Sequence, residues 1–206
     1  MNLTSRPRHR RPPDQAGGVS GNERLTALTG TVLLIGFAVE GLTIVSLGRL
    51  LTLHFFLGLL LIGPVLLKIG STGYRFTRYY TGAPAYVAKG PPAPLLRVLG
   101  PCVIVTSLAV LGTGVMLAIV GPVSGPWLFL HKATFVLWFG VMTIHVLTYV
   151  WQLPRILLSS RAAELGVRAG GGWIRGLLVA ASLLGGLVIA LLLVHLVHPW
   201  QAGAVR

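Results

Sequence analysis

Residues 127–151 read WLFLHKATFVLWFGVMTIHVLTYVW, an apolar run in which Lys132 is the only charged residue. A helix needs about 20 apolar residues to cross the ~30 Å hydrocarbon core of a bilayer. Inside that core a helix satisfies its own backbone hydrogen bonds, which an irregular segment does not. The run therefore predicts a transmembrane helix, and this helix carries two histidines, His131 and His145.

Four further apolar runs of similar length lie on either side of this one. They are residues 25–47, 50–69, 95–120 and 173–196. Of the 206 residues, 54% are hydrophobic and only 10% are charged, whereas a soluble domain has about 25% charged residues. We therefore expect an all-α integral membrane helical bundle of about five transmembrane helices, with a four-helix core at 25–152 and a fifth helix at 173–198.

The basic residues predict the orientation of these helices. Fourteen of the 17 Lys and Arg residues lie in the tail 1–24 or between the second and third and the fourth and fifth spans. Only Arg49, Lys132 and Arg206 lie on the other side. Short loops rich in Lys and Arg stay in the cytoplasm. We therefore expect a disordered cytoplasmic tail at 1–24, a cytoplasmic connection at 153–172 and a short outer tail at 199–206, in a bacterial plasma membrane.

The net charge and the single cysteine exclude other classes. A net charge of +13 would suggest a nucleic-acid partner for a soluble protein. Here the positive charges adjoin apolar runs, so the lipid bilayer with its anionic headgroups is the expected partner, and nucleic acid is not. Cys102 is the only cysteine, which excludes an intramolecular disulfide and a C-x-x-C-H site for covalent haem. Any haem would be held by coordination and packing alone.

The spacing of the membrane histidines points to a ligand site. His131 and His145 are 14 residues apart, nearly four helical turns, so they share a face and lie roughly 21 Å apart along the axis. His54 in the second span lies at the same depth as His131, about five residues inside the outer end. Two neutral imidazoles that face one another across a bundle suit axial ligation of haem iron. Zinc is disfavoured, because it would need two further ligands at that level and Glu40 is the only spare carboxylate there.

These residues resemble the transmembrane b-type cytochromes, a family of haem-binding membrane bundles that includes the membrane subunits of hydrogenases and formate dehydrogenases. The resemblance lies in HFFLG at His54, LHKATFVLW around His131, MTIHVL around His145 and LGTG at 111–114, and it covers roughly residues 25–152. It implies that paired histidines on facing helices hold two haem b groups, one in each leaflet.

Small and basic residues near the outer histidines fit the same interpretation. Gly112 and Gly114 would leave space for a macrocycle, although close helix packing in membranes uses glycine as well. If a haem is present, Arg49 and Lys132 are placed to meet its propionates as charged partners.

The inner half of the pattern departs from this family. The symmetric partner of His145 would stand at position 68, 14 residues after His54, and Lys68 is there instead. The inner site is therefore open between a Lys/His haem, a haem with one ligand, a quinone pocket and no ligand. Lys68 is also close enough to the cytoplasmic end to extend its ammonium group to the interface.

Two other polar features have alternative interpretations. Glu40 is a candidate proton-relay carboxylate or a neutral acid, but an ion pair with Lys132 or Arg49 is the favoured interpretation. His195 and His198 share a face at the outer end of the fifth span. They are candidates for a metal or a spare ligand, and a plain interfacial pair is the favoured interpretation.

The sequence favours a membrane protein that carries electrons through haem bound between the second and fourth helices. It would act as a subunit or relay of a membrane redox system of the quinone or ferric reductase type. Its electrons would come from a redox partner protein, a quinol or a small reductant. The alternatives are a cofactor-free membrane scaffold and a small proton or ion conduit that uses Glu40 and Lys68. The matching depth of His54 and His131 favours the first function.

Overall fold

The fold is an all-α bundle of membrane-spanning length. The computed structural model describes residues 13–91, 94–122, 125–149 and 172–203, and these residues contain helices and turns but no strand. Within them, five helices are long and apolar enough to cross a membrane: Gly18–Val45, Leu47–Tyr80, Pro94–Val120, Gly125–Thr148 and Gly172–Ala202. The predicted multi-pass membrane bundle is confirmed.

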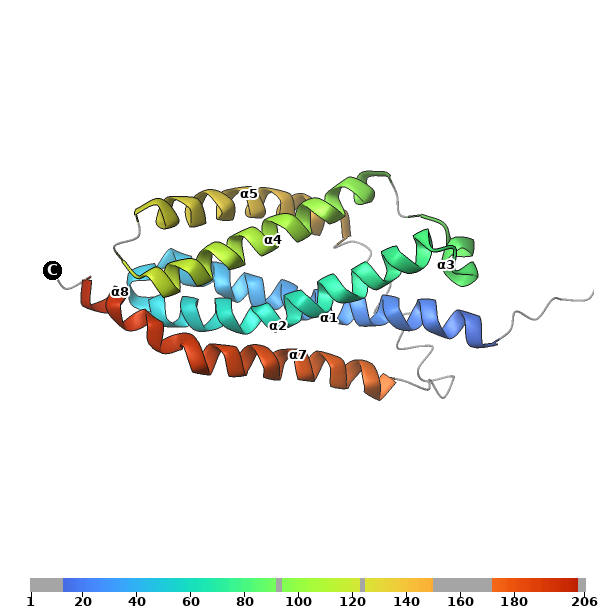
Figure 1. Cartoon of the computed structure of the whole chain (residues 1–206), viewed down its shortest axis with the longest axis horizontal. Helices are drawn as coiled ribbons and strands as arrows, with labels where there is room; N and C mark the ends of the chain where they lie inside the picture. Colours follow the sequence, from blue (N-terminus) through green and yellow to red (C-terminus); the bar gives the residue numbers. More distant parts are fainter. Residues whose placement is uncertain (1–12, 92–93, 123–124, 150–171, 204–206) are drawn as a thin grey trace, which may run out of the picture.

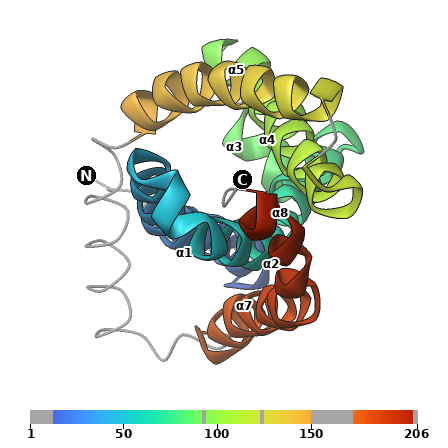
Figure 2. The ribbon, with the colours of Figure 1, turned by 90° about the vertical axis from the view of Figure 1, so that its left-hand side faces the viewer.

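Most of the helices pair as antiparallel neighbours. They are α1 (Pro13–Val45), α2 (Leu47–Tyr80), α3 (Pro84–Lys89), α4 (Pro94–Val120), α5 (Gly125–Tyr149), α7 (Gly172–Leu193), the 3₁₀ turn η1 (Val194–Val197) and α8 (His198–Gly203). The hairpins α1–α2 and α4–α5 form the core, and α7 packs along α2 (Figure 1). Seen down the long axis, α1 and α2 lie between α7 on one side and α4 with α5 on the other (Figure 2).

The first helix begins earlier than predicted. Residues 1–24 were expected to be disordered, but α1 starts at Pro13, so 13–24 are helical, while 1–12 lie outside the described residues. The physical reason is packing against distant segments. Val19 is buried against Ala83 and Tyr86, and Glu23 forms ion pairs with Arg75 and Lys89.

The second helix is also longer than its apolar run. It was predicted at 50–69, but it continues to Tyr80 and ends at a turn in which Gly82 has a φ of 78°. That left-handed conformation is easily reached only by glycine. After this turn Pro84 opens α3, so the segment expected to be a cytoplasmic loop is largely helical.

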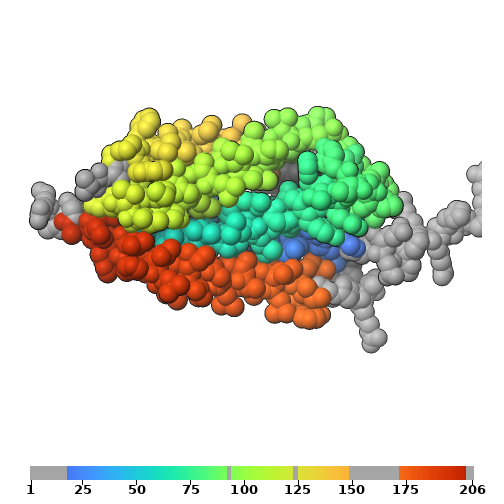
Figure 3. Space-filling view, viewed as in Figure 1, coloured from blue at the N-terminus to red at the C-terminus, as the bar shows by residue number. Residues whose placement is uncertain are grey.

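The fifth long helix belongs to the bundle and meets α2 through glycines. A Cβ added at Gly63 would clash with the backbone oxygen of Ser182 and lie 3.0 Å from the backbone nitrogen of Gly186. One added at Gly186 would clash with the backbone oxygen of Leu60. Glycine lets helix backbones approach this closely in membranes, where van der Waals packing drives association. In the space-filling view α2 is a band between α7 and α4 (Figure 3).

The chain then covers the N-terminal end of α2, which is predicted to face outward, with a short helix. The segment 199–206 was expected to be a plain tail, but α8 extends over residues 198–203. Trp200 packs against Phe55, with ring centroids 6.4 Å apart, and the amide of Gln201 donates a hydrogen bond of 2.7 Å to the hydroxyl of Thr52. The connection predicted at 153–172 lies outside the described residues except for Gly172, where α7 begins.

Candidate functional site

Two of the predicted ligands lie close together in the half of the bundle that contains the α1–α2 and α4–α5 turns, which the basic residues predict to be the outer half. The ring centroids of His54 on α2 and His131 on α5 are 6.5 Å apart, with an angle of 74° between the ring planes. Both side chains are half-buried. Since α5 packs mainly on α4 and hardly on α2, the two imidazoles meet across helices that are not close neighbours. We call His54, His131 and the side chains that hold them the outer layer.

The ring of His54 is held by two acceptors at the same nitrogen. Its Nδ1 lies 2.9 Å from Glu40 Oε1 and 3.0 Å from Thr43 Oγ1. Thr43 donates its own hydroxyl hydrogen to the backbone carbonyl of Glu40, so its oxygen is left to accept. A neutral His54 ring therefore carries its proton on Nδ1, and Nε2 keeps the free lone pair.

The partner of Glu40 differs from the expected one. An ion pair with Lys132 or Arg49 was predicted, but the carboxylate contacts His54, and both basic side chains are exposed. The reason is the rotation of α1 about its own axis. Glu40 faces α2 at the level of His54, and its side chain is only 14% exposed. Its second oxygen, Oε2, is buried and has no hydrogen-bond partner among the described residues.

The ring of His131 is held by the motif LGTG of α4. Thr113 Oγ1 lies 3.1 Å from His131 Nδ1 and donates to the backbone carbonyl of Ala109 at 2.8 Å. The hydroxyl of Thr134 lies 3.1 Å from that of Thr113 and completes the chain of hydrogen bonds. As at His54, the proton of a neutral ring belongs on Nδ1 and leaves Nε2 free.

The two glycines of this motif have different surroundings. A Cβ added at Gly114 would lie 3.2 Å from His131 Cε1, which is tighter than ordinary contact. A Cβ added at Gly112 would meet nothing within 4 Å, and Gly112 is exposed. Of the pair predicted to leave room for a ligand, only Gly114 borders the site.

The donor set of the outer layer fits an iron with two axial imidazoles. The two ring centroids are 6.5 Å apart, which is close enough for one metal ion between them to be within reach of both rings. Neither Nε2 has a hydrogen bond within the described part of the chain. That part also contains no group of three or more His, Cys, Asp or Glu residues able to hold a metal ion by themselves. The site supplies two ligands, which suits a cofactor that brings its own equatorial ligands.

A layer of apolar side chains lies between the two halves. Trp138 is 7% exposed, donates from Nε1 to Ser107 Oγ at 3.0 Å and packs on Phe37 with ring centroids 4.8 Å apart. On α2 the buried Leu61 is at the same level, midway between positions 54 and 68. We call these residues the middle layer. Sequence reasoning missed Trp138, although it stands seven residues from each histidine of α5 and so shares their face.

The inner half holds Lys68 and His145 and, within the described part of the chain, no second imidazole. Lys68 Nζ donates a hydrogen bond of 2.6 Å to the backbone carbonyl of Thr26, and a Cβ added at Gly30 would lie 2.9 Å from this nitrogen. Lys68 is also close enough to His145 to interact with it electrostatically. The ammonium group is thus directed toward α1 rather than extended along its own helix. We call Lys68, His145 and Thr26 the inner layer.

The remaining predicted residues lie at the outer end. Arg49 near the start of α2 and Lys132 next to His131 are exposed. His195 on η1 and His198 at the start of α8 are exposed too.

Comparison with known proteins gives no match to a protein-family model, a curated protein or a solved structure.

Proposed function

We propose that this chain is a b-type-cytochrome-like membrane protein that holds one haem b between α2 and α5 and carries electrons. The observation that supports this most is the pair His54 and His131, with ring centroids 6.5 Å apart and each Nδ1 held by a hydrogen-bond partner. When bound, a haem supplies one-electron oxidation and reduction at its iron.

The chain's own residues would prepare both ligands for iron. Glu40 and Thr43 fix the tautomer of His54, and Thr113 fixes that of His131, so that Nε2 is available on both sides. Partners of this kind orient a ligating histidine and raise its basicity. Because Gly114 has no side chain, it leaves room for the ring of His131. Arg49 and Lys132, exposed at the outer end, would pair with the propionates.

We propose one haem rather than two. The inner layer has a single imidazole, His145, and the amine of Lys68 is engaged by the carbonyl of Thr26. A lysine must lose a proton before it can bind a metal, and here the hydrogen bond to Thr26 holds its nitrogen against α1. The protein would thus be a relay or subunit of a redox system in a bacterial plasma membrane, of the quinone or ferric reductase type, with a partner protein or a quinone as the other reactant.

The conduit alternative is less well supported. Glu40 and Lys68 belong to the outer and inner layers. Between those layers lie the buried apolar side chains of Leu33, Leu61 and Val65, with Phe37 packed against them. A proton or ion path needs polar groups or water at each step, and these four side chains offer none. The polar groups described at this level, Trp138 Nε1 and Ser107 Oγ, are hydrogen-bonded to each other.

Spectroscopy of the purified protein tests the proposal. The full chain, expressed in haem-replete cells and purified in detergent, should give a reduced-minus-oxidised spectrum with a low-spin α band and about one haem per chain. His54→Ala should remove the band, and His195→Ala, an exposed histidine outside the site, should retain it. Well-folded but colourless wild-type protein would refute the proposal.

A further inference from the structure

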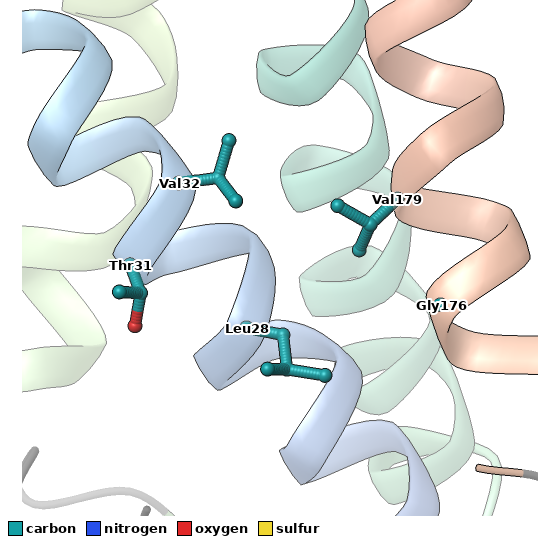
Figure 4. Close-up of a pocket in the computed structure, with 5 residues that line it drawn as sticks. All are labelled: Leu28, Thr31, Val32, Gly176 and Val179. Atoms are coloured by element: carbon teal, nitrogen blue, oxygen red, sulfur yellow. The ribbon is translucent and has the colours of Figure 1, made fainter. Parts of the chain in front are cut away.

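A second candidate site is an apolar crevice between α1 and α7, unconnected with the histidines. Its volume is about 400 Å³, and its lining consists of Leu28, Thr31, Val32, Gly176 and Val179. Val32 and Val179 point toward one another across the space (Figure 4). Both helices pack on α2 but only loosely on each other, which leaves the crevice between them.

The lining suits a hydrocarbon chain. The hydroxyl of Thr31, its one polar side-chain group, donates to the carbonyl of Ala27 at 3.1 Å and is therefore satisfied within α1. Gly176 contributes no side chain, and a Cβ there would meet nothing within 4 Å. A chain in this crevice would meet methyl and methylene groups on both sides and would not have to satisfy a polar group.

One end of the crevice is positively charged. Arg175 adjoins Gly176 and extends to α1, where a Cβ added at Gly21 would lie 3.6 Å from its Nη1. Its Nη2 is buried and has no hydrogen-bond partner among the described residues. Arg24, which is also basic, stands one helical turn before Leu28 on α1.

No acidic side chain that the structure describes is placed to neutralise Arg175. Glu23 is paired with Arg75 and Lys89, and Glu40 is paired with His54 in the outer layer. A buried guanidinium nitrogen without a hydrogen-bond partner is costly, and a phosphate oxygen is a partner that the planar fork of arginine matches well.

We propose that this crevice binds an anionic phospholipid of the cytoplasmic leaflet, with the phosphate on Arg175 and one acyl chain between Val32 and Val179. The basic-residue distribution predicts that this end faces the cytoplasm. Basic pockets between transmembrane helices on that side are typical sites for acidic headgroups. A zwitterionic phospholipid has the same acyl chains as an anionic one but no net negative charge, and an isoprenoid quinone has no phosphate.

Native mass spectrometry of the full chain in detergent tests the headgroup contact. Delipidated protein would be titrated with phosphatidylglycerol and with phosphatidylcholine of the same acyl chains. We expect the wild type to prefer phosphatidylglycerol by about fivefold, the effect of one basic residue near an anionic headgroup. Arg175→Gln should remove the preference, and Arg78→Gln, exposed at the end of α2, should retain it. Equal affinities in the wild type, a preference that survives Arg175→Gln, or an equal loss in Arg78→Gln would overturn the proposal.

A second pair of variants tests the chain contact. Gly176→Leu should fill the crevice and weaken the binding of both lipids. Gly185→Leu is the same substitution at an exposed position of α7 with open space around it, and it should leave the binding of both lipids unchanged. Thermal unfolding of both variants in the same detergent checks that they fold, and Val179→Trp replaces Gly176→Leu if that variant does not. Unchanged lipid affinity in the folded crevice variant would overturn the proposal, as would quinone binding that Gly176→Leu abolishes in a protein without headgroup preference.

Discussion

The outer and inner layers stand on the same two helices at the same spacing, yet they differ in chemistry. On α2, His54 and Lys68 are 14 residues apart, and on α5, His131 and His145 are 14 residues apart. In the outer layer two imidazoles are held by Glu40, Thr43 and Thr113. In the inner layer one imidazole is accompanied by an ammonium group that donates to a backbone carbonyl.

The comparison shows that helix register alone does not make a ligand site. Register brings positions 54 and 131, and positions 68 and 145, to matching levels. What separates the layers is the residue type on α2: position 54 offers an imidazole opposite His131, whereas position 68 offers an ammonium group that donates to the carbonyl of Thr26. Substitutions that remove this difference between the layers, or that change one residue responsible for it, test the comparison.

The largest effect should come from removing one histidine in each layer. His131→Ala should abolish haem binding, because the outer layer then has one axial ligand, whereas His145→Ala should leave about one haem per chain. Haem content per purified chain is the measurement, with size-exclusion behaviour as the control for folding. Equal losses in both variants would mean that the two layers depend on the same cofactor.

The difference between the layers should disappear if Lys68 is made a histidine. Lys68→His places an imidazole opposite His145 and removes the donor to Thr26, so haem content should rise from about one to about two per chain. Lys68→Met, of similar length and without a ligand nitrogen, is the control and should stay at one. An unchanged value in Lys68→His would show that the inner half lacks space for a second macrocycle.

A smaller effect should separate the two glycines of α4. Gly114→Val should reduce haem occupancy severalfold, because its Cβ is already 3.2 Å from His131 Cε1 and its branches would displace the ring. Gly112→Val, two residues away in open space, should bind haem as the wild type does. The α-band intensity per chain measures the haem occupancy of both variants. Equal occupancy would mean that the ring of His131 can move aside without weakening haem binding.

Within the outer layer the two ligands should tune the iron unequally. Glu40→Gln removes a negative charge from His54 while keeping the shape of the side chain, so the oxidised state loses stabilisation and the midpoint potential should rise. For one electron, about 59 mV corresponds to a tenfold change in the ratio of the oxidation states. Thr113→Val, which removes a neutral acceptor from His131, should shift the potential less. A redox titration with an equal shift in both variants would contradict the assigned asymmetry.

The smallest effect concerns the end of the bundle beyond the inner layer. Burial, with neighbouring Tyr74, raises the pKa of Tyr86 above its ordinary value of 10.0. The folded state therefore keeps this proton after the unfolded chain has lost it. The resulting stability is complete below about pH 10 and disappears as pH rises through the folded pKa. Tyr86→Phe should unfold at a temperature that falls less between pH 9 and 11 than in the wild type, while Tyr80→Phe, an exposed ring, should follow the wild type.

Hydropathy predicted the helices well where lipid surrounds them. The run 95–120 became α4 (Pro94–Val120), but α1 and α2 extend past their apolar runs. In those extensions polar and small side chains pack on one another, as in the hydrogen bond of 3.0 Å from Asn22 to the carbonyl of Ser71. Such pairs join residues 49 positions apart, and a local average of hydropathy contains no information about them.

The level of the site along the bundle could be predicted from the sequence, but the rotation of each helix about its own axis could not. Sequence position fixed the level of His54 and His131, and the structure places their rings together. The partner of Glu40 depends on how α1 is turned about its own axis, which many packings of the same apolar surface allow. For that reason its contact with His54, and that of Thr113 with His131, emerged only from the folded chain.

The glycine contact between α2 and α7 also sets the position of a residue far from it. Because Gly63 and Gly186 have no side chains, the backbones of α2 and α7 are in direct contact at these positions. This contact sets the register in which α7 packs against α2. Fourteen positions further on, Trp200 comes to rest on Phe55, the residue next to His54. An insertion of one residue between Gly186 and Trp200 would turn that end by about 100° and advance it by about 1.5 Å. The glycine contact in the middle of the bundle therefore determines which residue packs on Phe55 at the end of α2 that carries His54.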